Sequence, residues 1–174
     1  MSNPLIAGVV YERGAPIRDV MRAFVQELKS AKTNVHGILQ EIPKDMDPTN
    51  AGCGVDAIDI KTGKHVALVR PTQYELDNSV CSMDLSRLAE ASMILRRALD
   101  DQAEIVVVEK FGKHEKEGGG LSGDLMAVIS EGIPTMVTVP KIELESWQRF
   151  TGGLSTNLTC DIDQVLAWWK ALKA

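Results

Sequence analysis

The sequence predicts an α/β fold, namely a mostly parallel β-sheet with helices on both faces and a β-hairpin insertion. Two patterns predict this architecture. Short apolar runs bounded by turn residues indicate buried strands, and the clearest of them is Ile105 to Val108. Segments such as Asp84 to Leu99 carry apolar residues at helical spacing. Strands that alternate with helices in this way form parallel sheets that are covered on both faces.

Composition indicates one soluble domain, residues 1–174, since neither an internal repeat nor an interdomain linker interrupts the chain. The net charge of -5 disfavours nucleic-acid binding, which needs a basic surface, although a local pocket can still be positive. No apolar run approaches the roughly 20 residues that cross a bilayer. The first residues also lack the basic and apolar regions of a secretion signal. We therefore expect a cytoplasmic protein with no membrane contact.

In the first half of the chain, an apolar run followed by an amphipathic segment predicts a strand and then a helix, with Pro16 near the first turn of that helix. Further along, two alternating runs flank a short turn that contains Gly63, which is typical of a β-hairpin. The expected elements, in order, are a strand over 5–11, a helix over 16–28, a strand over 35–40, hairpin strands over 55–60 and 65–69, and a helix over 84–99.

The second half continues the alternation, and Gly132 is a plausible helix terminator. The expected elements are a strand over 105–108, a helix over 121–131, a strand over 134–139, and helices over 143–150 and 161–171. Ligands of such folds bind beyond the carboxyl ends of the strands. The loops over 12–16, 109–122 and 140–143 are therefore the candidate ligand-binding loops.

The first candidate loop has the layout of a phosphate-binding loop, because a strand with Gly8 leads through Gly14 to a helix. A working loop reads GxxxxGK[ST], in which the lysine contacts phosphates and the hydroxyl contacts magnesium. Here Ala15, Pro16 and Ile17 follow Gly14, so both groups are missing. The loop is either a plain turn or a weaker anion site that uses backbone N–H groups beside Arg13.

The second candidate loop, over 109–122, is rich in glycine and lysine. Gly118, Gly119 and Gly120 let the backbone approach a ligand closely, and Ser122 caps the next helix, so that N–H groups point at an anion. Positive charge comes from Lys110, Lys113 and Lys116. The alternative is a mobile, solvated, charged loop without a ligand.

Other features are less specific. The segment Thr151 to Ser155 is either a third ligand loop or only a helix end and turn. The cysteines are three in number and form no CxxC pair, so neither a disulfide framework nor a zinc site is expected. Cys81 precedes a helix and is a weak candidate for a thiolate ligand. The tryptophans fit either the core or a subunit contact, which leaves a homo-oligomer open; they are Trp147, Trp168 and Trp169.

The chain resembles the P-loop nucleoside triphosphatases known from thermophiles, whose β-strand motif reads Asp-Glu-x-Gly-x-x-Glu. Gly112 and Glu115 match the glycine and the final glutamate of that motif. The magnesium-linked aspartate falls on Glu109, and the catalytic glutamate falls on Lys110, which cannot act as a general base while protonated. The resemblance implies a three-layer P-loop-like fold that has lost the parts needed for phosphoryl transfer.

A closer resemblance is to the bacterial domain of unknown function family 2478, and it covers nearly the whole chain. It is carried by the segments 36–40, 81–84, 111–121, 134–137, 147–153 and 168–169, of which 111–121 (FGKHEKEGGGL) is the most specific. The chain departs from the family pattern at Met83 and at Lys110, where asparagine is usual. The family is similar to proteins encoded beside molybdenum-transport genes, which implies a link to molybdenum handling without assigning a reaction.

Together these features predict a non-hydrolytic protein that binds a small oxyanion, with molybdate as the leading ligand and no other cofactor. Lys113 would supply charge, and the glycines would supply N–H groups. Ser122 would add a hydroxyl and Cys81 a thiolate. No catalytic residues and no metal ligands are assigned. The alternatives are a divergent nucleoside triphosphatase, and a regulatory or scaffold partner without a small ligand. The expected ligand-binding residues are Arg13, Gly14, Glu109, Lys110, Lys113, Glu115, Gly118, Gly119, Gly120 and Ser122.

Overall fold

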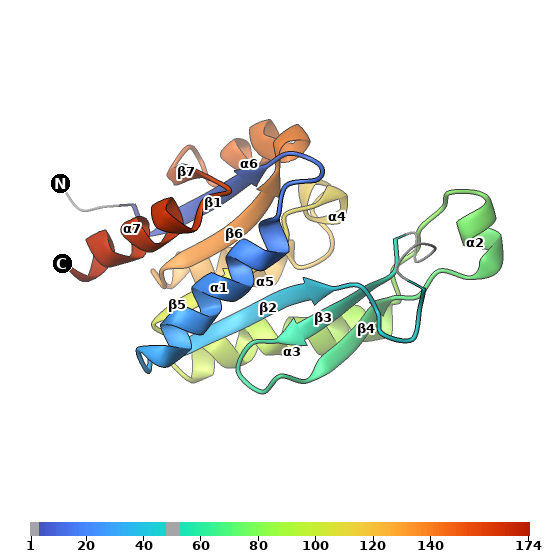
Figure 1. Ribbon diagram of the computed structural model, residues 1–174, viewed down its shortest axis with the longest axis horizontal. Coiled ribbons are helices and arrows are strands. Elements are labelled where there is room, and N and C mark those ends of the chain that lie inside the picture. Colours follow the sequence, from blue (N-terminus) through green and yellow to red (C-terminus); the bar gives the residue numbers. More distant parts are fainter. Residues whose placement is uncertain (1–3, 48–52) are drawn as a thin grey trace.

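The computed structural model describes residues 4–47 and 53–174, whose strands form one seven-stranded sheet (Figure 1). The strand order is β4-β3-β2-β5-β6-β1-β7. Neighbouring strands pair in parallel except in the β2–β3 and β3–β4 pairs, so the mostly parallel sheet with a hairpin insertion is confirmed. The strands are β1 Ile6–Tyr11, β2 Val35–Glu41, β3 Val55–Asp59, β4 His65–Val69, β5 Ile105–Val108, β6 Thr135–Pro140 and β7 Ser155–Thr159.

Helices cover both faces of the sheet and complete three layers. Met21 and Phe24 of α1 pack with Trp168 of α7 on one face, whereas Leu95 of α3 and Leu125 of α5 pack on the other. In Figure 1, α1 lies in front of the sheet and α3 lies behind it. The helices are α1 Ile17–Ser30, α2 Gln73–Asp77, α3 Leu85–Asp100, α4 Lys113–Lys116, α5 Ser122–Ser130, α6 Leu144–Phe150 and α7 Ile162–Lys173, with a 3₁₀ turn over Lys141–Glu143.

The tryptophans are core residues, with 0% of Trp147, 7% of Trp168 and 8% of Trp169 exposed. The indole Nε1 of Trp147 donates a hydrogen bond to Ser155 Oγ at 2.9 Å. A Cβ on Gly8 would fall 2.5 Å from the same Nε1, so this glycine allows β1 to pack closely against Trp147. A homo-oligomer stays a prediction, because packing within one chain already explains the burial of these rings.

Three short elements were not predicted. Strand β7 follows the turn at Thr151 to Ser155 and pairs with β1 at the edge of the sheet. Helices α2 and α4 have one turn each and are too short to show a helical period. A readable signal existed for α2, because Thr72 and Glu75 form a capping box, in which each side chain bonds the other residue's backbone N–H.

The expectation for the cysteines is wrong, since Cys53 and Cys81 form a disulfide with a Cα–Cα distance of 6.1 Å. The β3–β4 hairpin brings Cys53, two residues before β3, beside the segment that precedes α3. Cys81 therefore has no thiolate to offer, and Cys160 is the free cysteine of the described residues. Within residues 4–47 and 53–174, no helix is long and apolar enough to cross a membrane.

Candidate functional site

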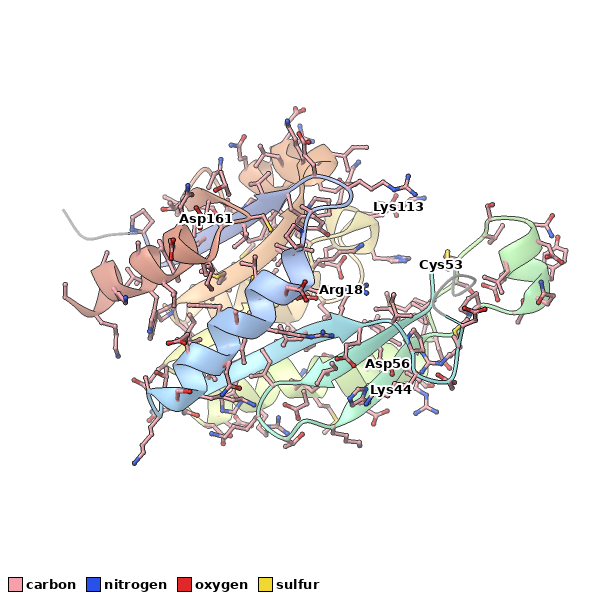
Figure 2. The ribbon with its side chains drawn as sticks, viewed as in Figure 1. Arg18, Lys44, Cys53, Asp56, Lys113 and Asp161 are labelled. Atoms are coloured by element: carbon pink, nitrogen blue, oxygen red, sulfur yellow. A yellow bond between two sulfur atoms is a disulfide. The ribbon has the colours of Figure 1, made fainter. Side chains whose placement is uncertain are left out.

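Two adjoining cavities open at the carboxyl ends of the parallel strands. The smaller, of about 350 Å³, lies beside the β1–α1 turn, and the larger, of about 530 Å³, lies beside the hairpin and α4. Four residues line both cavities, namely Arg18, Gln40, Glu109 and Lys110. Figure 2 labels Arg18 near the start of α1 and Lys113 at the start of α4, both at this end of the sheet. The site therefore lies where ligands bind in doubly wound folds.

In the β1–α1 turn, two backbone N–H groups are already bonded within the turn. Its N–H groups at Ala15 and Ile17 donate to the carbonyls of Glu12 and Ala15, at 3.1 and 2.8 Å. Pro16 stands at the helix N-cap and has no N–H of its own. Arg13 and Gly14 line the smaller cavity, as expected for a wall of the site. The N–H groups of Ala15 and Ile17 are thus already bonded, whereas residues of the turn line the smaller cavity.

The glycine-rich loop after β5 is folded around Glu115. The carboxylate of Glu115 accepts hydrogen bonds from the N–H groups of Gly112, at 3.1 Å, and Leu121, at 3.4 Å. The N–H groups of Gly118 and Gly119 donate to the carbonyls of Glu115 and His114. The loop is therefore closed on itself, and the N–H groups of Gly118 and Gly119 are used in hydrogen bonds within it.

The structure brings together some of the expected ligand-binding residues and separates others. Glu109, Lys110, Lys113 and Glu115 line the larger cavity. Over the described ranges, neither cavity lining includes Gly118, Gly119, Gly120 or Ser122, and the side chain of Ser122 is buried. The backbone and hydroxyl roles expected for these four residues thus have no geometric support in this conformation.

Glu109, at the end of β5, is 4% exposed and lies where the two cavities meet. Its Oε2 accepts a hydrogen bond from the Gln40 N–H at 3.0 Å, whereas its Oε1 is buried and has no hydrogen-bond partner in the described chain. Burial raises the pKa of Glu109 to about 7, and this outweighs the lowering by the Gln40 N–H and by the cations Arg18, Arg22 and Lys110. The protonated form of Glu109 is therefore accessible near neutral pH.

The cations of the site are left without ion-pair partners. Among the described residues, none of Arg18, Lys110 and Lys113 forms a salt bridge. Lys116, on the same short helix as Lys113, pairs instead with Glu143 at 3.3 Å. The two linings together hold four cations, Arg13, Arg18, Lys110 and Lys113, against three carboxylates, Asp19, Glu109 and Glu115. This small positive excess in an acidic chain favours an anionic ligand.

The residues at this edge do not fit the magnesium ion that P-loop hydrolases use. Within residues 4–47 and 53–174, no group of three His, Cys, Asp or Glu side chains is placed to hold a metal ion. The position after Gly14 holds Ala15 in place of the lysine, and Pro16 stands in place of the hydroxyl residue. Lys110 adds a positive charge directly after Glu109, which further disfavours a cation there.

Sequence reasoning missed several residues of the site. Gln40 and Thr138 line the smaller cavity, and His114 lines the larger one. The signal for Gln40 and Thr138 was available, because each lies near the carboxyl end of a predicted parallel strand. The apolar lining of the larger cavity had no such signal, since it comes from distant parts of the chain: β2, the hairpin, the start of α3 with the segment before it, and the residue before α5.

Comparisons with known proteins agree on the fold and the family. The "Molybdenum import ATP-binding protein ModC 2" of Bradyrhizobium diazoefficiens is 32% identical over 167 residues, which are 95% of this chain but 18% of that protein. The solution structure of a human cancer-related nucleoside triphosphatase has a TM-score of 0.65 at 16% sequence identity. The aligned region covers 88% of this chain and 87% of the triphosphatase chain. At this identity the likeness shows the fold alone, and it confirms the expected P-loop-like architecture.

A protein-family comparison covers nearly the whole sequence. The family described as "Protein of unknown function (DUF2478)" matches residues 6–168, which include all seven strands, both cavities and the glycine-rich loop. The resemblance stated from the motifs is therefore confirmed. This chain belongs to the DUF2478 family.

Proposed function

We propose that this protein binds a small tetrahedral oxyanion at the carboxyl edge of its sheet and does not hydrolyse nucleotides. The observation that carries the proposal is the group of unpaired cations Arg18, Lys110 and Lys113 around the two cavities. Arginine and lysine side chains are the usual partners of oxyanions, because they combine charge with several N–H donors. Arg18 and Lys110 line both cavities and are the central pair of this site.

Molybdate is the first anion to test. A relative that aligns with 95% of this chain has a name that refers to molybdenum import. Because the chain matches only 18% of that relative, the name guides the choice of ligand and assigns neither ATP binding nor transport to this protein. Tungstate and sulfate have the same shape and charge as molybdate, and phosphate differs in carrying protons near neutral pH.

Glu109 is compatible with an anion because of its protonation behaviour. An ionised carboxylate would repel a dianion, whereas the neutral acid can donate a hydrogen bond to one of its oxygens. Burial raises the pKa of Glu109 to about 7, so the neutral form is accessible near physiological pH. Oε1, which has no partner within the described residues, is the atom that would make this contact.

Isothermal titration of the purified protein with molybdate, tungstate, sulfate and phosphate tests the proposal. We expect saturable binding of at least one anion, weakened about tenfold or more in Lys110→Gln, because a charge beside the ligand is lost. Lys116→Gln is the matched control, since Lys116 is already paired with Glu143 and lines neither cavity. No heat from any of the four anions would overturn the proposal.

A divergent nucleoside triphosphatase is the second candidate, and the fold likeness is the observation that favours it. It predicts magnesium-dependent phosphate release from ATP or GTP that is abolished in Glu109→Gln or Glu115→Gln. Glu115 holds the loop after β5 together, so only the Glu109 variant tests chemistry directly. Failure to release phosphate from any nucleotide removes this candidate.

A scaffold protein without a small ligand has less support. That alternative expects exposed tryptophans near Trp168 and an empty pocket. Trp168 and Trp169 are instead buried in the core with α1. Two results together would support this alternative: a partner protein that co-purifies with the chain, and titrations in which none of the four anions gives heat.

A further inference from the structure

We infer that the larger cavity binds an organic anion, a molecule with an acidic head and an apolar body, as a ligand beyond the inorganic oxyanion proposed above. Its volume of about 530 Å³ falls in the range of about 300–1,000 Å³ that is typical of small-molecule sites. A tetrahedral oxyanion fills only a small part of such a space. The lining therefore decides what else the cavity accepts.

One side of the larger cavity is an apolar wall. Ile38 of β2 and Leu68 of β4 are almost fully buried, and Met83 and Leu88 are partly buried beside them. These side chains come from β2, from the end of β4, from the segment before α3 and from the first turn of α3, and all line the same cavity. An inorganic ion gains nothing from such a wall, whereas an organic body is removed from water against it.

The same cavity is also lined by charged side chains, namely three cations and the carboxylates of Glu109 and Glu115. Lys110, Lys113 and Arg18 line it and form no ion pair among the described residues. Glu109 adds a buried oxygen, Oε1, without a hydrogen-bond partner in the described part of the chain. Buried polar atoms are almost always bonded, so the unbonded oxygen of a residue that lines the cavity is a candidate contact for a ligand or an ordered water.

The rim of the cavity is held in place before any ligand binds. The disulfide between Cys53 and Cys81 joins the segment before β3 to the segment before α3, and both cysteines line the cavity. The neighbouring Ser82 donates hydrogen bonds to Glu75 Oε2 from its N–H, at 3.1 Å, and from its hydroxyl, at 2.8 Å. A rim fixed in this way lowers the entropic cost of binding.

Naphthyl phosphate is a suitable probe, because it joins an acidic head to a rigid apolar body. Its affinity for the oxidised protein is measured by isothermal titration and compared with that of inorganic phosphate and of naphthol. We expect naphthyl phosphate to bind at least about tenfold more tightly than either, since it alone uses both sides of the cavity.

Two variants of the apolar wall, one control and one charge variant assign the binding to this cavity. Met83→Gln and Leu88→Gln make the wall polar, and we expect each to reduce the advantage of naphthyl phosphate over phosphate several-fold. Met93→Gln is the matched control, because Met93 is 68% exposed on α3 and lines a different surface. Lys113→Gln is expected to weaken naphthyl phosphate and to leave naphthol unchanged. Thermal unfolding of each variant confirms that it is folded.

The outcomes separate this inference from the oxyanion proposal. Equal affinities for naphthyl phosphate and phosphate, or an advantage that survives both wall variants, would overturn the inference while leaving molybdate binding intact. Tight naphthyl phosphate binding with no response to any inorganic anion would support the inference and overturn the oxyanion proposal. Absence of naphthyl phosphate binding would overturn the inference.

Discussion

The two cavities that meet at Glu109 differ in what surrounds them. The smaller is bounded by the β1–α1 turn, where a P-loop hydrolase holds its phosphates, and here Ala15 and Pro16 stand in place of the working residues. The larger is lined by an apolar wall and by lysines. The difference teaches that the smaller cavity lacks the side chains of a working phosphate-binding loop, whereas the larger cavity combines apolar and charged lining residues.

Breaking the disulfide should have the largest effect on stability and should act on the larger cavity only. Cys81→Ser removes a crosslink between residues 28 apart in the sequence, and we expect the free energy of unfolding to fall by about 2–4 kcal/mol. Neither cysteine lines the smaller cavity, so binding of an inorganic anion there should persist. Urea unfolding checks the stability, with Cys160→Ser as the control, since Cys160 forms no disulfide. Equal stability of Cys81→Ser and the oxidised parent would contradict the role of this crosslink.

The next effect concerns Glu109, which both cavities share. Burial raises its pKa from 4.5 to about 7, so the folded state holds the proton more tightly than the unfolded state does. The contribution of protonated Glu109 to the free energy of unfolding is fully present below pH 4.5, and it is lost as the pH rises through about 7. We expect Glu109→Gln to be more stable than the parent by about 2–3 kcal/mol at about pH 8, with little difference near pH 5.

Urea unfolding at the two pH values measures this difference, and Glu117→Gln, at an exposed position, serves as the control. A Glu109→Gln advantage that is the same at both pH values would show that ionisation of Glu109 is not its cause. The same ionisation should make oxyanion binding tighter as the pH falls. Because His114 also lines the larger cavity, His114→Gln is needed to separate its contribution from that of Glu109.

A smaller effect is expected for the arginine between the cavities. Arg18→Gln removes a charge from both linings, and we expect anion affinity to fall about tenfold, which corresponds to about 1.4 kcal/mol. Arg22→Gln on the same helix is the control, because Arg22 pairs with Glu41 at 2.6 Å and lines neither cavity. Equal losses in the two variants would mean that the overall charge of α1 matters and the cavity does not.

The smallest effect tests whether the glycine loop is closed on itself. A Cβ on Gly120 would fall 2.6 Å from Glu115 Oε1, whereas a Cβ on Gly118 would meet nothing within 4 Å. Both glycines have positive φ angles, of 55° and 84°, so alanine is strained at either position. We expect Gly120→Ala to lower the free energy of unfolding by about 1 kcal/mol more than Gly118→Ala does. Equal losses would indicate that Glu115 is free to move.

Much of the fold was readable from periodicity, whereas much of the site was not. Strands such as Ile105–Val108 and helices such as Leu85–Asp100 are long and regular enough to identify from their apolar spacing. Strand β7 was missed because its sequence, STNLT, is polar and lies at the sheet edge, where one side needs no partner. Local pattern therefore identifies elements that bury a full face and misses those that do not.

The sequence placed the candidate loops at the ligand edge of the sheet, and the binding of an anion by their residues stays a prediction. Lys110 and Lys113 lie where the strand order placed them, at the ligand edge of the sheet. In the same loop, the N–H groups of Gly118 and Gly119 donate to carbonyls. The sequence did not show this, because glycine signals an unusual backbone without saying whether its N–H group meets a ligand or a carbonyl. The Cys53–Cys81 pairing depends on how the hairpin folds back, a long-range contact that spacing along the chain does not encode.

The most direct test of anion binding between the cavities is the position of a heavy oxyanion in a crystal of the protein. Tungstate scatters anomalously and can be located without ambiguity beside lighter atoms. The account predicts one strong peak in contact with Arg18 and Lys110, close to Glu109 Oε1, that is absent from crystals of Lys110→Gln. A peak at another surface, or no ordered tungstate in crystals that have their two cavities open to solvent, would contradict it.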